Sequence, residues 1–118
     1  LRHAHQESAP QVQNYGYLLE AEGRRIFCPG AADPRFPEVF ALVDGLRPDV
    51  AILNFPWVTL SSARKALNAM APRCTVLTHL PPANNDPLGF HRAVEHAIQG
   101  LPNTVVLDRF AQTVTFDV

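Results

Sequence analysis

The apolar residues near the start of the chain fall into two short β-type runs. Residues 15–20 and 24–28 are rich in tyrosine, leucine, isoleucine and phenylalanine, and Gly23 lies in the short connection between them. A glycine at this place can adopt the positive φ angle that a tight hairpin requires. The pattern therefore predicts a β-hairpin.

Three later stretches carry apolar residues at helical spacing. Residues 38–46 form the first, and the second begins at the pair Ser61-Ser62, which can cap a helix, and stops before Pro72. The third has Asp86 as a good N-cap, Pro87 at its first helical position and Gly100 as its stop. These stretches predict three helices.

Continuous apolar runs separate these stretches. Residues 50–53 and 75–78 are typical of strands that are covered on both faces in a parallel sheet, and 50–53 is the expected central strand. Residues 105–107 and 113–116 are expected to be two closing strands. Because strands alternate with helices, the order predicts an α/β fold with a mixed sheet and flanking helices.

Composition limits the classes of protein to which the chain can belong. With 118 residues, 47% of them hydrophobic and 18% charged, it is expected to be one globular domain spanning residues 1–118. The net charge of -1 and the scattered basic residues argue against a nucleic-acid partner. No apolar run approaches the ~18 residues of a membrane span, so no membrane partner is expected.

The cysteines and the first residue give indications of the cellular location of the protein and of the gene product to which it belongs. Cys28 and Cys74 form no CxxC pair, which favours a reducing, cytoplasmic location and two small buried side chains. The chain opens on Leu1 and a polar segment without a signal-peptide core. We therefore expect the sequence to begin inside a longer gene product or to have been trimmed.

Histidines are the strongest candidates for chemistry. His79 directly follows a predicted strand, where a side chain can present a ring nitrogen to a metal or substrate, although a loop histidine bonded to backbone is equally expected. His3 and His5 have a spacing compatible with a shared metal on an extended segment, but such a terminal pair is more often solvated. His91 and His96 are five residues apart on a predicted helix and are expected at the surface.

Motifs for other chemistries are absent from the sequence. It contains no GxGxxG or GxxxxGK[ST] phosphate loop, and prolines on both sides of Gly30 remove amide donors there. It also contains no GxSxG motif around any serine. A nucleotide site and an α/β-hydrolase nucleophile are therefore not expected.

The order of these features resembles a known family. A His-bearing segment, the run Asn14-Tyr15-Gly16-Tyr17-Leu18-Leu19-Glu20, a glycine turn, Arg25-Ile26-Phe27, a Pro-Gly turn, Asp49-Val50-Ala51-Ile52-Leu53 and finally Thr78-His79 follow one another. This series is similar to the C-terminal half of metallo-β-lactamase-fold hydrolases, especially the branch of ascorbate-phosphate lactonases. The resemblance covers roughly residues 3–116 and implies half of an αββα sandwich.

The resemblance also implies a set of metal ligands. By position these are His5, or less favourably His3, then the residue after Gly30, and His79. The residue after Gly30 is Ala31, where the family usually has an aspartate that bridges two metals, and Asp33 is a conceivable substitute. The metal would be zinc or manganese, bound weakly, because a catalytic zinc usually needs three protein ligands.

Two functions follow from the resemblance. In the first, the chain is part of a metal-dependent hydrolase that acts on a small-molecule ester, lactone or phosphoester, with an incomplete metal site because the family's HxHxDH motif is absent. In the second, it is a non-catalytic, degenerate relative that serves as a binding or assembly module. Because half of a sandwich leaves one sheet face open, we expect a homodimer or a partner chain to cover that face.

Overall fold

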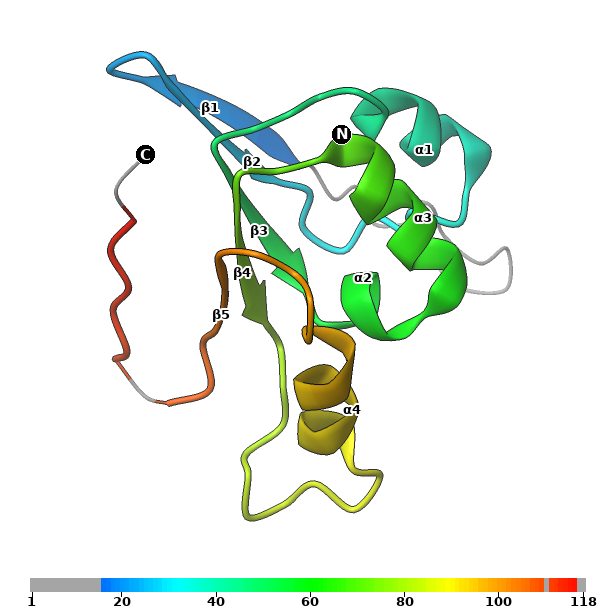
Figure 1. The fold of residues 1–118 in the computed structure, drawn as a ribbon, viewed down its shortest axis with the longest axis vertical. Coiled ribbons are helices and arrows are strands. Elements are labelled where there is room, and N and C mark those ends of the chain that lie inside the picture. Colours follow the sequence, from blue (N-terminus) through cyan, green and yellow to red (C-terminus); the bar gives the residue numbers. More distant parts are fainter. Residues whose placement is uncertain (1–15, 110, 117–118) are drawn as a thin grey trace, which may run out of the picture.

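The computed structural model describes residues 16–109 and 111–116, which form an α/β fold with one mixed sheet (Figure 1). The sheet has the order β1-β2-β3-β4-β5, so β3 is the central strand, as the sequence predicts. The strands are β1 (Tyr17–Ala21), β2 (Arg24–Cys28), β3 (Val50–Asn54), β4 (Cys74–Thr78) and β5 (Thr104–Val106). The helices are α1 (Pro37–Val43), α2 (Pro56–Thr59), α3 (Ser61–Met70) and α4 (Phe90–Ala97).

The predicted hairpin is confirmed. β1 pairs with β2 in antiparallel register from Tyr17 opposite Cys28 to Ala21 opposite Arg24. Glu22 and Gly23 form the turn, and both have positive φ angles, of 52° and 77°. This combination matches the twist of the flanking strands, which explains why a glycine is needed in the connection.

All the helices lie on one side of the sheet (Figure 1). β2, β3, β4 and β5 are parallel neighbours, and each connection between them carries at least one helix. Crossovers between parallel strands are almost always right-handed, so a sheet that grows in one direction places every helix on the same face. The opposite face receives no helix from the described residues.

The core lies between the sheet and these helices. Leu53 and Leu77 are opposite each other in the β3–β4 register, and both are 0% exposed. They pack with apolar side chains of the helices, namely Val43, Trp57, Val58, Ala66, Leu67, Met70 and Val94. The helical spacing and the buried-strand runs therefore describe the same core.

Two polar side chains connect the elements around this core. Asp49 accepts a hydrogen bond from the backbone N–H of Arg25 at 2.8 Å and one from the Arg73 guanidinium at 3.3 Å, so it joins the starts of β2, β3 and β4. The Arg25 amide, and after it Arg73, hold the pKa of Asp49 below its ordinary value against the opposing effect of burial. Arg64 of α3 donates to the carbonyl oxygen of Ala97 at 2.9 Å and so holds the end of α4.

The helices differ from the sequence prediction in several respects, and α1 ends at Val43, three residues before the predicted end at residue 46. The four-residue helix α2 was not predicted, because Pro56 was interpreted as a break although proline is favoured in the first turn of a helix. Neither Ser61 nor Ser62 caps α3, whose N-cap is Leu60 without a side-chain hydrogen bond. The third predicted helix begins at Phe90 rather than at Pro87.

The last predicted strand is also wrong. Residues 111–116 form no strand, although their side chains alternate between exposed and half-buried along the segment. The chain reverses after β5 and returns on the side away from the helices (Figure 1). Gln112 anchors this return by donating to the Val106 carbonyl at 3.2 Å and accepting from the amides of Asp108 and Arg109. The alternation of side chains in this segment thus reflects burial of one of its sides, without backbone pairing to a neighbouring strand.

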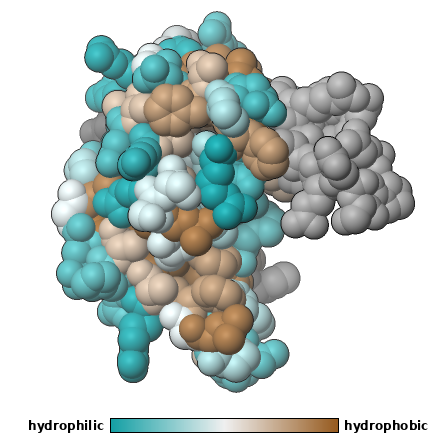
Figure 2. All heavy atoms as spheres, turned by 90° about the vertical axis from the view of Figure 1, so that its right-hand side faces the viewer, coloured by the Kyte–Doolittle hydropathy of each residue, from teal (hydrophilic) through white to brown (hydrophobic). Residues whose placement is uncertain are grey.

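Exposed apolar side chains gather at β1 rather than on β3 and β4. Tyr17 is 59% exposed and Leu19 53%, whereas Cys74 and Val76, on the helix-free face of β4, are 4% exposed. On the helix side, hydrophobic and hydrophilic spheres are interspersed (Figure 2). Among the described residues, no helix has the length and apolarity needed to cross a membrane.

Candidate functional site

The carboxyl ends of three parallel strands meet at one edge of the sheet. The loop with Ala31 and Asp33 follows β2, Asn54 ends β3, and His79 follows β4. Ligands of open α/β sheets usually bind at such an edge. Adjacent strands lie about 4.8 Å apart, so the ends of β2 and β4 are roughly 10 Å apart across β3. Asp33, however, lies five residues beyond the end of β2, and among the described residues no group of three possible metal ligands includes it or His79.

His79 has an unusual backbone conformation. Its φ angle is 70°, in the left-handed region, which a residue other than glycine adopts at a cost of about 1–3 kcal/mol. Its side chain is exposed to solvent. Five further non-glycine residues of the described chain, among them Glu22 in the hairpin turn and Ala71 at the end of α3, also have positive φ angles, so this conformation alone does not mark a functional site. His79 differs from them because it places an imidazole at the carboxyl end of a parallel strand.

The Thr78 hydroxyl connects His79 to the neighbouring strand. Its oxygen lies 3.1 Å from the Nδ1 atom of His79 and 3.3 Å from the carbonyl oxygen of Leu53 in β3. In the described part of the chain, no hydrogen bond or ion pair involves the other ring nitrogen of His79, Nε2. One side of the imidazole is therefore held, and the other is accessible.

Asp33 is engaged with a neighbouring arginine. Its carboxylate accepts hydrogen bonds from the backbone N–H of Arg35 at 2.9 Å and from the Arg35 guanidinium at 2.7 to 3.1 Å. A metal at Asp33 would have to compete with this bidentate pair. Ala31, the residue after Gly30, is exposed and offers no ligand atom in its side chain.

The loop between β4 and α4 is fixed by its own hydrogen bonds. The Asp86 carboxylate accepts from the backbone N–H of His91 at 2.8 Å and of Phe90 at 2.9 Å, and these two amides, His91 first, lower the pKa of Asp86. The Nε2 atom of His91 donates to the carbonyl oxygen of Pro81 at 2.6 Å. The start of α4 therefore already holds a carboxylate, and His91 is a half-buried structural residue rather than the surface residue that was predicted.

The described residues do not fit a complete zinc or manganese centre. Among residues 16–109 and 111–116, no group of three histidine, cysteine, aspartate or glutamate side chains could hold a metal ion. His3 and His5, the remaining candidate ligands, lie outside the described residues. The metal site thus stays a prediction. Of its candidate ligands among the described residues, His79 is the one with an accessible ring nitrogen.

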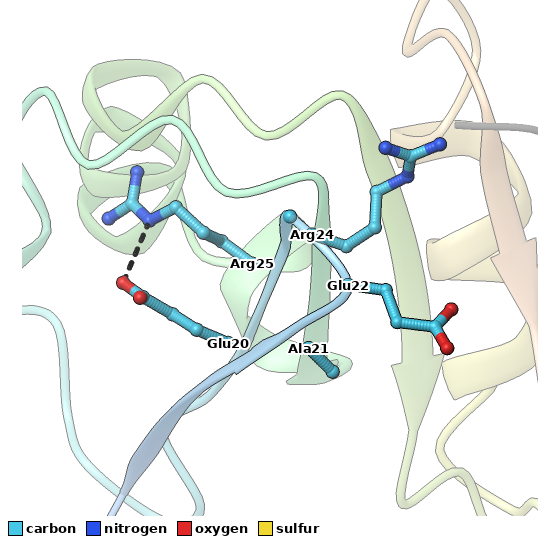
Figure 3. A pocket seen from close by; sticks show the side chains of 6 residues that line it. Glu20, Ala21, Glu22, Arg24 and Arg25 are labelled. Atoms are coloured by element: carbon cyan, nitrogen blue, oxygen red, sulfur yellow. Dashed lines mark ion pairs between the residues drawn. The ribbon is translucent and has the colours of Figure 1, made fainter.

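A shallow concave surface lies at the tip of the β1–β2 hairpin, at the opposite end of β2 from this edge. It encloses about 260 Å³ and is lined by Glu20, Ala21, Glu22, Gly23, Arg24 and Arg25. Figure 3 shows the arginine and glutamate side chains spreading outward, with one ion pair between Glu20 and Arg25 at 4.0 Å. Because its two glutamates and two arginines balance in charge and most of its lining residues are exposed, this hollow offers no built site.

Comparison with known proteins finds no matching protein family, no matching curated protein and no matching solved structure. Sequence reasoning found His79 from its position after a strand but missed Thr78, which was interpreted only as a strand residue. It identified Asp86 as a capping residue but placed the helix that it caps three residues too early.

Proposed function

We propose that this chain belongs to the lineage of metal-dependent hydrolases of the metallo-β-lactamase type and contributes His79 to a site for hydrolysis of an ester, lactone or phosphoester. The observation that carries the proposal is the strained, exposed His79 at the carboxyl end of β4, with its Nε2 atom unpartnered among the described residues. A bound divalent metal in such a site supplies an activated water. His5, or His3, and Asp33 are the further ligands that the proposal invokes.

The arrangement of the elements also supports this lineage. A hairpin leads into parallel strands, the helices cover one face only, and the candidate ligands follow the ends of the strands. Helices on one face only are expected for half of an αββα sandwich, although Cys74 and Val76 on the helix-free face of β4 are already only 4% exposed. His5 or His3 and the acid–base groups must then come from outside the described residues.

Metal content tests the proposal. Protein purified without a histidine tag is equilibrated with zinc or manganese, and the bound metal is measured by mass spectrometry for wild type, His79→Ala and His96→Ala. We expect weak, substoichiometric binding that His79→Ala abolishes and that His96→Ala, a change at an exposed histidine of α4, leaves intact. Tight equimolar metal that survives His79→Ala would show that the ligands are wrong.

The substitution Ala31→Asp tests the position of the missing carboxylate. If the residue after Gly30 faces the metal, a new carboxylate there should raise the affinity for zinc, as measured by calorimetry. Ala83→Asp, in the exposed loop before α4, adds the same charge elsewhere and should have no effect. Equal binding by Ala31→Asp and wild type would place Ala31 away from the ligand position.

A second function, an assembly module, is favoured by the surface of β1. This edge strand is exposed along its whole length, and its exposed side chains include Tyr17, Leu18 and Leu19. An exposed apolar edge strand is a ready template for pairing with another chain. We propose that a second copy pairs along β1, which gives a homodimer with a largely apolar, sheet-mediated interface.

Light scattering on the chain at micromolar concentration tests this assembly. Leu19→Lys should convert the dimer to a monomer, whereas Leu42→Lys, at a similarly exposed leucine of α1, should not. A stable wild-type monomer that binds no hydrophobic dye would rule out the homodimer. A dimer that both variants preserve would place the interface elsewhere.

A further inference from the structure

The hydroxyl group of Thr78 can make two hydrogen bonds with different roles. Its oxygen is within hydrogen-bond distance of the Leu53 carbonyl oxygen and of His79 Nδ1. A hydroxyl carries one proton to donate, and its oxygen can also accept. A carbonyl oxygen only accepts, so the Leu53 contact forms a hydrogen bond only if Thr78 donates to it.

The protons can be arranged in two ways. In the first, Thr78 donates to Leu53 and accepts from an N–H at His79 Nδ1, so both contacts are hydrogen bonds. In the second, Thr78 donates to an unprotonated Nδ1, and the contact with Leu53 is left without a proton. The first arrangement makes two hydrogen bonds and the second makes one, and half-buried polar groups favour the arrangement that satisfies more of them.

We propose that Thr78 is a positioning residue that holds neutral His79 in the tautomer with its proton on Nδ1. The lone pair is then on Nε2, the ring nitrogen that has no partner among the described residues. An imidazole binds a metal or accepts a proton through its unprotonated nitrogen, and the hydrogen bond made by the other nitrogen decides which one that is. Thr78 thereby determines that Nε2, rather than Nδ1, is the reactive nitrogen of His79.

The Thr78 hydroxyl is well placed to hold the imidazole of His79. Thr78 lies opposite Asn54 in the β3–β4 register, and its backbone carbonyl accepts from the N–H of Phe55 at 3.1 Å. Its hydroxyl therefore belongs to a residue that is paired with the neighbouring strand, rather than to a loop residue. The β3–β4 register ends at Thr78, and His79 follows with a left-handed φ angle. Thr78 is therefore the last strand residue before the imidazole. A site on strands is held more precisely than a site on loops.

Nuclear magnetic resonance measures this tautomer directly. Long-range proton–nitrogen correlation spectra of protein labelled with ¹⁵N at histidine distinguish the two tautomers of a neutral imidazole. They are recorded on metal-free protein at about pH 8.5, two units above the ordinary imidazole pKa of ~6.5. The His79 signals are assigned by their loss in His79→Gln. We expect the pattern of a proton on Nδ1 in wild type, and a proton on Nε2 there overturns the proposal.

Two substitutions at Thr78 separate the hydroxyl from the shape of the side chain. Thr78→Ser retains the hydroxyl and should keep the wild-type pattern, whereas Thr78→Val removes it and should shift the population towards a proton on Nε2. Thr115→Val makes the same change at an exposed position and serves as the control. Identical tautomer populations in wild type and Thr78→Val overturn the proposal. If the valine variant does not fold, the wild-type spectrum decides alone.

The consequence for metal binding rests on the proposed function. In zinc titrations, Thr78→Val should weaken binding by about 10-fold, as expected for loss of a group that orients a ligand, and Thr78→Ser should not. If wild type shows the expected tautomer but binds no zinc, the proposed function fails and the positioning role of Thr78 stands. If zinc binds but the tautomer is the other one, the positioning role fails alone.

Discussion

Truncation of Leu77 to alanine is the sharpest test of the packing between sheet and helices. Leu77 is 0% exposed, lies opposite Leu53 and contacts the cluster to which the helices contribute. The change removes three carbon atoms, which amounts to about 2.4 kcal/mol of transfer free energy at ~0.8 kcal/mol each. The residual cavity adds to this, so we expect a loss of about 3 kcal/mol, within the range of ~2–5 kcal/mol for buried leucines.

Urea unfolding followed by circular dichroism measures this loss. Leu88→Ala is the matched control, because Leu88 is 77% exposed and the same three carbons are removed; its effect should stay within about 0.5 kcal/mol. The slope of the free energy against urea should remain unchanged in both variants. A loss below about 1 kcal/mol for Leu77→Ala, or equal losses for the two variants, would refute the assignment of Leu77 to a packed core.

Three further predictions concern polar and backbone features. The pKa of Asp49 is lower in the folded protein than its ordinary value of 3.8. Its contribution to stability is therefore complete above pH 3.8 and is lost as the pH falls through the lower folded pKa. In urea unfolding at a series of acidic pH values, Asp49→Asn should flatten the dependence of the midpoint on pH. His79→Gly should stabilise the fold by about 1 kcal/mol relative to His79→Ala in thermal unfolding, because glycine adopts a φ of 70° without strain, and equal stabilities would show that His79 is not strained. Arg64→Met should destabilise by about 1 kcal/mol and speed hydrogen exchange in α4, whereas unchanged exchange would show that the bond to Ala97 does not hold this helix.

The sequence predicted the elements correctly where buried residues recur at a regular spacing along the chain. The hairpin, the central strand and the three longer helices follow from apolar spacing and from one glycine with positive φ. Two of the errors lie at prolines: Pro56 begins a helix that was interpreted as a loop, and Pro87 follows Asp86 in a series that resembles a helix start. In both cases the local preference of proline is compatible with two structures, and tertiary packing decides between them.

The candidate site shows the same division. His79 was predicted because its position after a strand depends only on the chain itself. The role of Thr78 was not, because its hydroxyl meets Leu53 only through the register of two strands whose residues are 25 positions apart. The pair of Asp33 with Arg35 spans two positions and could have been predicted as a local turn. A contact between distant segments therefore explains why the role of Thr78 was missed, whereas the Asp33–Arg35 pair was within reach of the sequence.

The strand order of this sheet repeats the order of the strands in the chain. Each new strand is added to the free edge left by its predecessor, and none must enter between two strands that are already paired. During synthesis the amino-terminal segments leave the ribosome first. The hairpin can therefore form while β3 is still being translated, and every later β-strand finds its neighbour already present. Folding can keep pace with translation in this topology, one strand and its helix at a time.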